Sequence, residues 1–450
     1  MLKKSLIFLL LLISLIFISY FSLAAKYKYD VRQDYQYAFE NSHHIEVPVN
    51  ISQGTFQLSS KHHGDTGFIE LNIKATLLGH FIEPSVEITA DGHTSVLSFE
   101  RGAQGIRYIN LPVTHNTSIE LKGHYLTIAD QAARLMLFNN PSIQPQTKIL
   151  IISPHPDDAE IAAFGLYSQH NSVIVTITAG EAGPHNYDEI YTDVQQHYQA
   201  KGKLRVWDSI TVPMLGGVLP EQAINLGYFD GTLPQMYAVP ETPVHSLYAG
   251  ISDINDFRQQ NLSTLTPLSQ GKATWSALVN DLKYIIQKFS PDIIVTPYPA
   301  LDWHSDHKLS TRAVIDTLQQ LNLQHGQLFL YTNHLSFNNY FPYGAQGELA
   351  PIPPDFTQSL YFDSLYSFSP TKPKAKIFAL EAMHDLRPDT SWLEPSGAFK
   401  LFKSALLNKL LLRDQSYFRR AVRANELFLV VNFSSLSQEK VINSLNGTEE

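Results

Sequence analysis

The sequence predicts an α/β protein in which a doubly wound parallel sheet follows an all-β region. Residues 27 to about 145 alternate apolar and polar side chains with a period of two, as over Ile69–Leu77. From Thr147 onward, short continuous apolar runs alternate with segments of helical spacing, which is typical of parallel strands joined by helical crossovers. The chain has 450 residues, enough for two or three domains.

The composition excludes several classes of protein. Hydrophobic residues make up 44% and charged residues 17% of the chain, which excludes a disordered protein. The net charge is -9 and no basic cluster stands out, so we expect no nucleic-acid partner. The absence of cysteine excludes disulfides, thiolate metal sites and a cysteine nucleophile. A metal ion would therefore need histidine and carboxylate ligands.

Residues 1–25 have the features of a signal peptide or a membrane anchor. Lys3 and Lys4 precede an almost wholly apolar run over 5–23, and Ser22–Ala24 matches a small-x-small cleavage pattern. The run is also long enough to span a bilayer, so membrane association through residues 5–25 is an alternative to cleavage. In either case we expect the remaining chain to be exported, to the periplasm or the cell envelope. The absence of cysteine suits such a location better than it suits a disulfide-rich secreted protein.

Residues 26–145 are expected to form an antiparallel β-sandwich. Strand-like alternation recurs over Phe68–Leu77, Val86–Asp91 and Ile119–Lys122, with turn residues every 8–12 positions. Asn139–Pro145 is polar and rich in proline, and we place the domain boundary there. The sandwich could bind carbohydrate or position the enzyme at the envelope.

The second domain is expected over residues 146–440. Its predicted strands are Lys148–Ser153, Val173–Thr178, Ile210–Leu215, Asp292–Thr296 and Leu328–Thr332. Its predicted helices are Ala159–His170, Tyr191–Trp207, Ala273–Phe289 and Lys308–Leu321. A long stretch that we expect to be irregular, residues 216–272, interrupts this alternation. Because a doubly wound sheet binds ligands at the carboxyl ends of its strands, these ends are where chemistry is expected.

Two clusters of histidine and aspartate follow predicted strands. The first, Ser153–Glu160, reads SPHPDDAE, and the second, Asp302–His307, reads DWHSDH. His155 and Asp158 are three residues apart, so one turn can bring both side chains to one point. Imidazole and carboxylate together suit Zn²⁺ or a similar divalent ion. The first cluster alone could be an aspartate N-cap beside a structural histidine, but two clusters at one sheet edge favour a metal site.

These motifs resemble those of the PIG-L/LmbE-like N-acetylglucosaminyl deacetylases, a family of zinc-dependent amidases. HPDD follows the first predicted strand of the second domain, the TxGExG-like segment Thr178–Gly183 follows the second strand, and HxDH follows a later one. The resemblance covers about residues 147–390. It implies a Rossmann-like parallel sheet that binds no nucleotide, and the phosphate-binding pattern GxGxxG is absent from this sequence.

The resemblance also implies roles for individual residues. His155, Asp158 and His307 would hold Zn²⁺, or another divalent ion. Asp157 would be the general base that takes a proton from the attacking water. His304 would stabilise the oxyanion or protonate the leaving amine, with Asp306 orienting it and raising its pKa. Three further residues would lie on the substrate side: Glu181, Asp230 and His384.

The substrate-side residues also have structural interpretations. Glu181 could be a solvated side chain in a glycine-rich turn, Asp230 part of an ordinary Asp-Gly turn, and His384 a core or surface histidine. The helix after the glycine segment departs from the family pattern of arginine and glutamate, which leaves the substrate open. It offers Gln195, Gln196, Lys201 and Arg205.

The function implied is that of an exported, zinc-dependent deacetylase. It would remove the N-acetyl group from an N-acetylglucosamine-type amino sugar in a glycan, glycolipid or conjugate. Two alternatives stay open: a metal-dependent amidase that acts on a non-sugar N-acyl compound, and a glycan-binding protein without catalytic activity.

Overall fold

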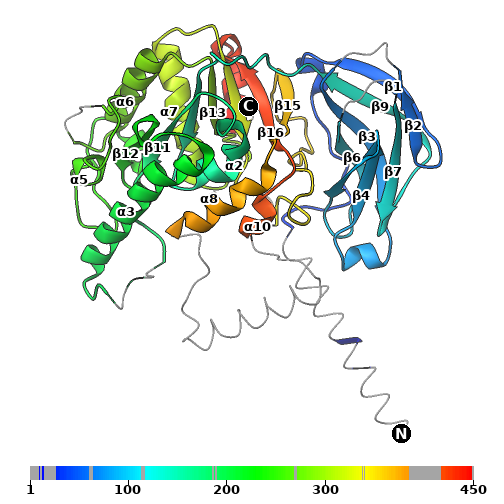
Figure 1. Ribbon diagram of the computed structural model, residues 1–450, viewed down its shortest axis with the longest axis horizontal. Coiled ribbons are helices and arrows are strands. Elements are labelled where there is room, and N and C mark those ends of the chain that lie inside the picture. Colours follow the sequence, from blue (N-terminus) through cyan, green and yellow to red (C-terminus); the bar gives the residue numbers. More distant parts are fainter. Residues whose placement is uncertain are drawn as a thin grey trace.

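Figure 1 shows the computed structural model of the protein. The structure describes residues 10, 13–14, 27–59, 64–112, 117–184, 187, 190–267, 271–336, 338, 340–384 and 417–447. The predicted signal peptide or anchor lies, apart from residues 10, 13 and 14, outside the described residues. Within the described ranges, no helix is long and apolar enough to cross a membrane.

Two antiparallel sheets make up the N-terminal region. The first has the strand order β1 (Ile45–Ile51), β9 (Gln131–Phe138), β3 (Thr66–Ala75) and β6 (Gln104–Pro112), and β8 (Leu126–Ile128) also pairs with β3. The second has the order β2 (Thr55–Leu58), β7 (Thr117–His124), β4 (Ser85–Ala90) and β5 (His93–Ser98). Val86, Ile88 and Ala90 of β4 are buried, as the period-two pattern predicts. Buried apolar residues from both sheets, among them Ile69 of β3 and Ile88 of β4, meet in one hydrophobic cluster.

A seven-stranded sheet forms the second region. Its order is β12 (Ala223–Tyr228), β11 (Ser172–Thr178), β10 (Ile149–Ser153), β13 (Ile293–Pro297), β14 (Gln327–Tyr331), β16 (Glu426–Asn432) and β15 (Ser364–Phe368). The strands from β12 to β14 are parallel, whereas β16 runs antiparallel to both of its neighbours. The sheet is therefore mixed, and the prediction of a parallel sheet is wrong at this edge.

Helices cover both faces of this sheet. Along β10, Ile149 and Ile151 belong to one hydrophobic cluster, and Leu150 and Ile152 belong to another. The first cluster includes residues of α2 (Asp158–Tyr167), α8 (Lys376–Ala382) and α10 (Tyr417–Ala421). The second includes residues of α3 (Val194–Thr211), α6 (Trp275–Phe289), α7 (Ser305–Gln320) and α11 (Glu439–Asn446). Burial on both faces explains why the strands are continuously apolar.

One predicted strand, Ile210–Leu215, is wrong. Helix α3 continues to Thr211, and a 3₁₀ helix, η3 (Val212–Gly216), follows it. Pro213 has no amide hydrogen for a strand ladder but fits the first turn of a helix. The third strand of the region is instead β12, every residue of which is buried. It lies within the stretch expected to be irregular, together with α4 (Leu233–Ala238) and α5 (Asn255–Arg258).

The hydrophobic core continues across the predicted domain boundary. Tyr37, Phe39 and Phe138 of the N-terminal region belong to the same buried cluster as Phe341 and Phe362 of the second region. Backbone hydrogen bonds also join the two regions: Gln36 N–H to Asp355 O (2.7 Å), His43 N–H to Asp363 O (2.7 Å) and Leu349 N–H to Val96 O (2.8 Å). In Figure 1, β15 accordingly forms the edge of the main sheet that lies toward the N-terminal strands. The two regions thus share part of their core.

Candidate metal centre

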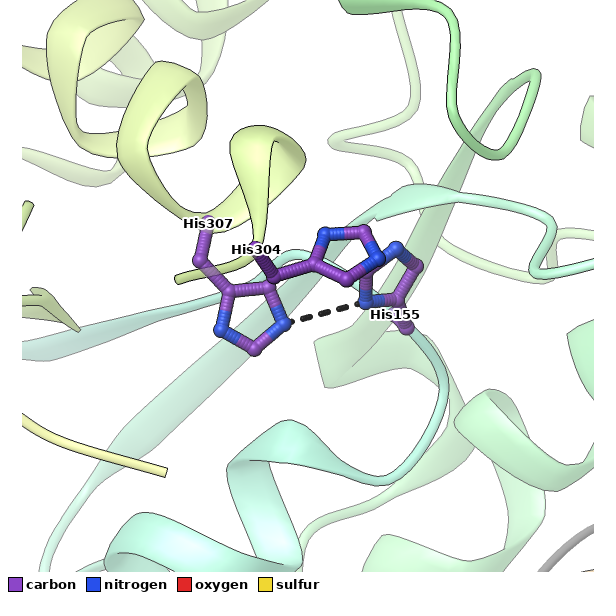
Figure 2. Close-up of side chains that lie close together, drawn as sticks. All are labelled: His155, His304 and His307. Carbon is purple, nitrogen blue, oxygen red and sulfur yellow. Dashed lines mark hydrogen bonds between the residues drawn. The ribbon is translucent and has the colours of Figure 1, made fainter. Parts of the chain in front are cut away.

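The three predicted metal ligands come together at the carboxyl ends of the central strands. His155 follows β10, Asp158 begins α2, and His307 lies in the first turn of α7. The Nε2 atom of His307 lies 3.1 Å from Nδ1 of His155 and 3.1 Å from Oδ2 of Asp158. The remaining pair, His155 Nδ1 and Asp158 Oδ2, is 3.3 Å apart. Figure 2 shows the rings of His155 and His307 facing each other.

This spacing fits a divalent cation. Tetrahedral Zn²⁺ with ligands at about 2.0–2.2 Å places its ligand atoms roughly 3.3–3.6 Å apart. All three side chains are buried, and two imidazoles with one carboxylate are a usual donor set for Zn²⁺. Two further groups share residues with these ligands, and in each the possible ligand atoms lie within 4.8 Å of one another. One group is Asp158, His307 and His334, and the other is His155, Asp230 and Asp306. In addition, Oδ1 of Asp306 is buried and has no hydrogen-bond partner among the described residues.

Two residues that the sequence did not single out hold these ligands in place. Oδ2 of Asp302 lies 2.9 Å from Nδ1 of His307, which leaves Nε2 facing the other ligands. The side-chain amide of Asn333 donates a hydrogen bond of 2.7 Å to Oδ1 of Asp158. Asp302 and Asn333 follow β13 and β14, so the rule that places ligands at the carboxyl ends of strands could have found both.

Helix α2, which carries the aspartate ligand, is kinked. Ala163 has φ -140° and ψ 20°, so the helical hydrogen bonds are interrupted there. Glu426 of β16 accepts hydrogen bonds from the two amides at 165–166, at 2.7 and 2.8 Å. Lys376 of α8 donates to the carbonyl oxygen of Ile161, and its Nζ lies 3.6 Å from Glu426. This buried ion pair therefore caps the helical segments on both sides of the kink.

The carboxylate of Asp157 is held beside the metal ligands. Asp157 has φ 140°, a strained conformation for a residue other than glycine. Its carboxylate accepts a hydrogen bond of 3.2 Å from Arg205 Nη2, and Arg205 also donates to the carbonyl oxygens of Gly180 (2.8 Å) and Pro156 (2.9 Å). Gly180 has φ 65°, and a Cβ there would lie 2.6 Å from Arg205. Arg205 thus fixes the predicted base, Asp157. In the sequence alone, Arg205 is only one residue of a helix that departs from the family pattern.

His304 lies beside the ligands, but Asp306 does not orient it as predicted. The ring of His304 lies 4.6 Å from that of His155 and 5.0 Å from that of His307. Because His304 is the N-cap of α7, its Nδ1 accepts a hydrogen bond of 3.3 Å from the backbone N–H of Asp306. The Asp306 carboxylate instead accepts from the Gly231 N–H (2.7 Å) and lies 3.4 Å from His155 Nε2.

Asp306 raises the pKa of His304 as predicted, but the net shift of this pKa is downward. Burial, followed by the charges of His155 and His307, lowers the pKa of His304 to about 4, and the opposing effect of Asp306 is smaller. In the metal-free protein, this lowered pKa keeps His304 neutral near pH 7. Since its Nδ1 accepts a hydrogen bond, its proton is on Nε2.

Asp230 and Glu181 lie on the Nε2 side of His155, whereas the other two predicted ligands face its Nδ1 atom. Oδ1 of Asp230 is 3.2 Å from His155 Nε2. Burial opposes ionisation of Asp230, but His155 outweighs it and keeps the pKa of Asp230 below its usual value. Glu181 is fully buried behind Asp230 and accepts hydrogen bonds from Asp230 N–H (3.1 Å) and Ser246 Oγ (2.7 Å). Burial, and then the charge of Asp230, raise the pKa of Glu181 to about 7.

His384 pairs with a carboxylate of α3, whereas His334 belongs to a group that could hold a metal ion. The Nδ1 atom of His384 lies 2.7 Å from Asp208 of α3, and its backbone N–H donates to the same carboxylate at 3.0 Å. Within the described part of the chain, His384 belongs to none of the groups that could hold a metal ion. His334, which the sequence did not single out, does: it follows β14, and its ring lies 5.1 Å from that of His307.

Comparisons with known proteins agree with this site. A family model described as PIG-L, GlcNAc-PI de-N-acetylase, matches residues 150–318. No relative among the curated proteins matches the chain. Two solved structures are similar, but at TM-scores too low to inform the function. GalB, the 4-carboxy-2-hydroxymuconate hydratase of Pseudomonas putida KT2440, has 10% identity and a TM-score of 0.33 over 63% of this chain and 95% of its own. A family two carbohydrate esterase from Cellvibrio japonicus has 13% identity and a TM-score of 0.16 over 78% of this chain and 100% of its own.

The matched segment contains the whole of the metal centre described above except Asn333 and His334. It includes the ligands His155, Asp158 and His307, the carboxylate of Asp157 that Arg205 holds, and His304 at the N-cap of α7. Residues 150–318 therefore form a PIG-L family domain, that of a metal-dependent deacetylase or hydrolase.

Proposed function

We propose that the protein removes the N-acetyl group from an N-acetylglucosamine-type amino sugar in a glycan, glycolipid or conjugate. The observation that carries this proposal is the convergence of His155, Asp158 and His307 within 3.3 Å of one another, inside a domain matched by a GlcNAc-PI de-N-acetylase model. Zn²⁺ is the ion that this donor set favours, and other divalent ions are the alternative.

The residues around the centre divide the chemistry of amide hydrolysis between them. His155, Asp158 and His307 would hold a divalent ion, which would supply polarisation of the acyl carbonyl and a lower pKa for water. Asp157, held by Arg205, takes a proton from the water as its oxygen bonds to the acyl carbon. Neutral His304 donates a hydrogen bond from Nε2 to the oxygen that becomes negative. When the carbon–nitrogen bond breaks, Asp157 returns the proton to the departing amine, and acetate and a free amino sugar result.

The finer features of the fold and the location of the protein belong to the same proposal. The strand order β12-β11-β10-β13-β14 supports a Rossmann-like catalytic domain over residues 146–440, preceded by a β-sandwich over residues 26–145. The apolar run over residues 5–23 supports export, to the periplasm or the cell envelope, with either cleavage or retention of the N-terminal segment.

The function can be tested by measuring acetate and amine release. The purified protein, loaded with Zn²⁺, is incubated with N-acetylglucosamine, N,N′-diacetylchitobiose, an N-acetylglucosaminyl glycolipid and an N-acetylated peptide. We expect acetate and a new primary amine, detected by mass spectrometry, from a sugar substrate. Neither product should form after chelation, and Asp157→Asn should form both about 10²–10⁴ times more slowly. Release from the peptide alone would favour a non-sugar amidase. Sugar binding without any release would favour a glycan-binding protein.

A further inference from the structure

Trp303 is an exposed aromatic residue at the metal centre. It lies between Asp302, which holds a metal ligand, and His304. The side chain is 57% exposed, more than either of the other described tryptophans, Trp207 at 43% and Trp275 at 5%. A large exposed aromatic side chain beside a polar site is characteristic of ligand-binding surfaces.

The indole ring is one imidazole away from the metal ligands. Its centroid lies 5.3 Å from that of His304 and 5.8 Å from that of His334. His304 in turn lies 4.6 Å from His155 and 5.0 Å from His307. Two successive ring-to-ring contacts therefore connect the ligand rings with Trp303.

The backbone holds Trp303 rigidly at this position. Its N–H donates a hydrogen bond of 3.0 Å to His334 O, and Ser336 N–H donates to Leu301 O at 2.8 Å. Asp302 and Leu335 form an antiparallel bridge between the same two segments. A backbone fixed on such a ladder needs little ordering when a ligand binds.

We infer that Trp303 is the stacking surface for a pyranose ring next to the one that carries the reacting acetamide. This inference rests on the proposed function and narrows its substrate to a glycan of two or more sugars. The C–H face of a pyranose would cover the exposed indole, while the sugar hydroxyl groups stay in water. A monosaccharide that reaches the metal ligands would leave Trp303 uncovered.

Binding of two sugars to matched variants tests the inference. N,N′-diacetylchitobiose and N-acetylglucosamine are titrated calorimetrically into the full chain with metal removed by chelation, and again with Zn²⁺ bound. By analogy with stacking of nucleic-acid bases on aromatic side chains, Trp303→Ala should weaken diacetylchitobiose binding about 10-fold or more. Trp303→Phe should lose less, and N-acetylglucosamine binding should hardly change. Trp207→Ala, which removes an exposed indole on α3, is the matched control and should bind like the wild type.

The outcomes separate this inference from the proposed function. Zinc content equal to that of the wild type shows that the site is intact in each variant. Equal affinity of wild type and Trp303→Ala for diacetylchitobiose would overturn the inference, as would equal losses for both sugars or no binding of either sugar by the wild type. Selective loss of diacetylchitobiose binding without acetate release by the wild type would support the stacking surface and contradict the deacetylase. If acetate is released, Trp303→Ala should raise KM for diacetylchitobiose far more than it lowers kcat.

Discussion

The hydrogen bond between Asp302 and His307 should control how tightly the metal is held. Both oxygens of the Asp302 carboxylate are in use: Oδ2 faces Nδ1 of His307 at 2.9 Å, and Oδ1 accepts from the backbone N–H of His304 at 2.9 Å. Asparagine can supply an oxygen to only one of them. If its NH₂ group faces His307, the proton of that ring must move to Nε2, the atom that faces the metal. If the NH₂ group faces His304, two donors oppose each other.

The expected magnitude follows from either arrangement. A charge-assisted hydrogen bond contributes about 1.5–3 kcal/mol. This corresponds to roughly one to two orders of magnitude in an equilibrium constant, and residues that orient metal ligands usually change affinity about 10- to 100-fold. We therefore expect Asp302→Asn to raise the dissociation constant for Zn²⁺ about 10- to 100-fold.

The dependence of zinc binding on pH supplies a second observable. Burial opposes protonation of His307, but Asp158 and Asp302 outweigh it and raise the pKa of this residue to about 10 in the metal-free protein. Binding of Zn²⁺ must displace that proton, so the affinity should increase as the pH rises towards 10. Asp302→Asn removes one of the two carboxylates that raise this pKa, so the increase should end at a lower pH.

Competition with a chromophoric chelator at several pH values measures both effects. Asp316→Asn is a suitable control because Asp316 lies on the same helix, α7, and bonds to Arg312 and Trp275 instead of to a ligand. Its zinc affinity should equal that of the wild type. Unchanged affinity and an unchanged pH profile in Asp302→Asn would refute the assignment of His307 as a ligand held by Asp302.

Three further predictions follow from the same structure. Asp157→Asn should lower kcat by about 10²–10⁴ with zinc content retained, and acetate release combined with elemental analysis checks this; loss of the metal as well would contradict a role as base alone. Glu426→Gln should destabilise the fold by about 3–5 kcal/mol in urea unfolding, because it leaves Lys376 buried without its partner, and adding Lys376→Met should recover part of the loss. A chain that begins at Gln144 should bind hydrophobic dyes and lose near-ultraviolet circular dichroism, since it lacks the N-terminal residues of a shared hydrophobic cluster; a native spectrum would show that the catalytic region folds alone.

The sequence predicted best those site residues that stand close, in the chain, to the end of a predicted strand. His155, Asp158 and His307 could be predicted because each stands within a few residues of a strand end, and parallel strands bring such ends together. Arg205 and Asn333 could not be assigned roles, since each acts through a contact with a residue far away in the chain. A hydrogen bond of that kind leaves no periodicity in the sequence.

The errors have a similar physical origin. The apolar residues of Ile210–Leu215 suit a strand, and only the fold decides that they close a helix while Ala223–Tyr228 takes the sheet position. Asp306 stands two residues from His304, yet its carboxylate turns to Gly231 because His304 is the helix cap and only the Asp306 backbone faces it. Short separation in sequence therefore did not predict which groups are in contact.

Strand β16 has a consequence for the order in which the protein can assemble. It follows β14 and β15 in the sequence, yet it is inserted between them and supplies Glu426 to the kinked helix that begins at Asp158. During synthesis, the ribosome completes both sheet neighbours and that helix before the strand that joins them has emerged. Until residues 426–432 are available, β14 and β15 each present an unpaired edge, and the helix lacks its internal cap. The three metal ligands have thus all been synthesised by residue 307, but the helix that begins at Asp158 gains its internal cap only after Glu426 has emerged.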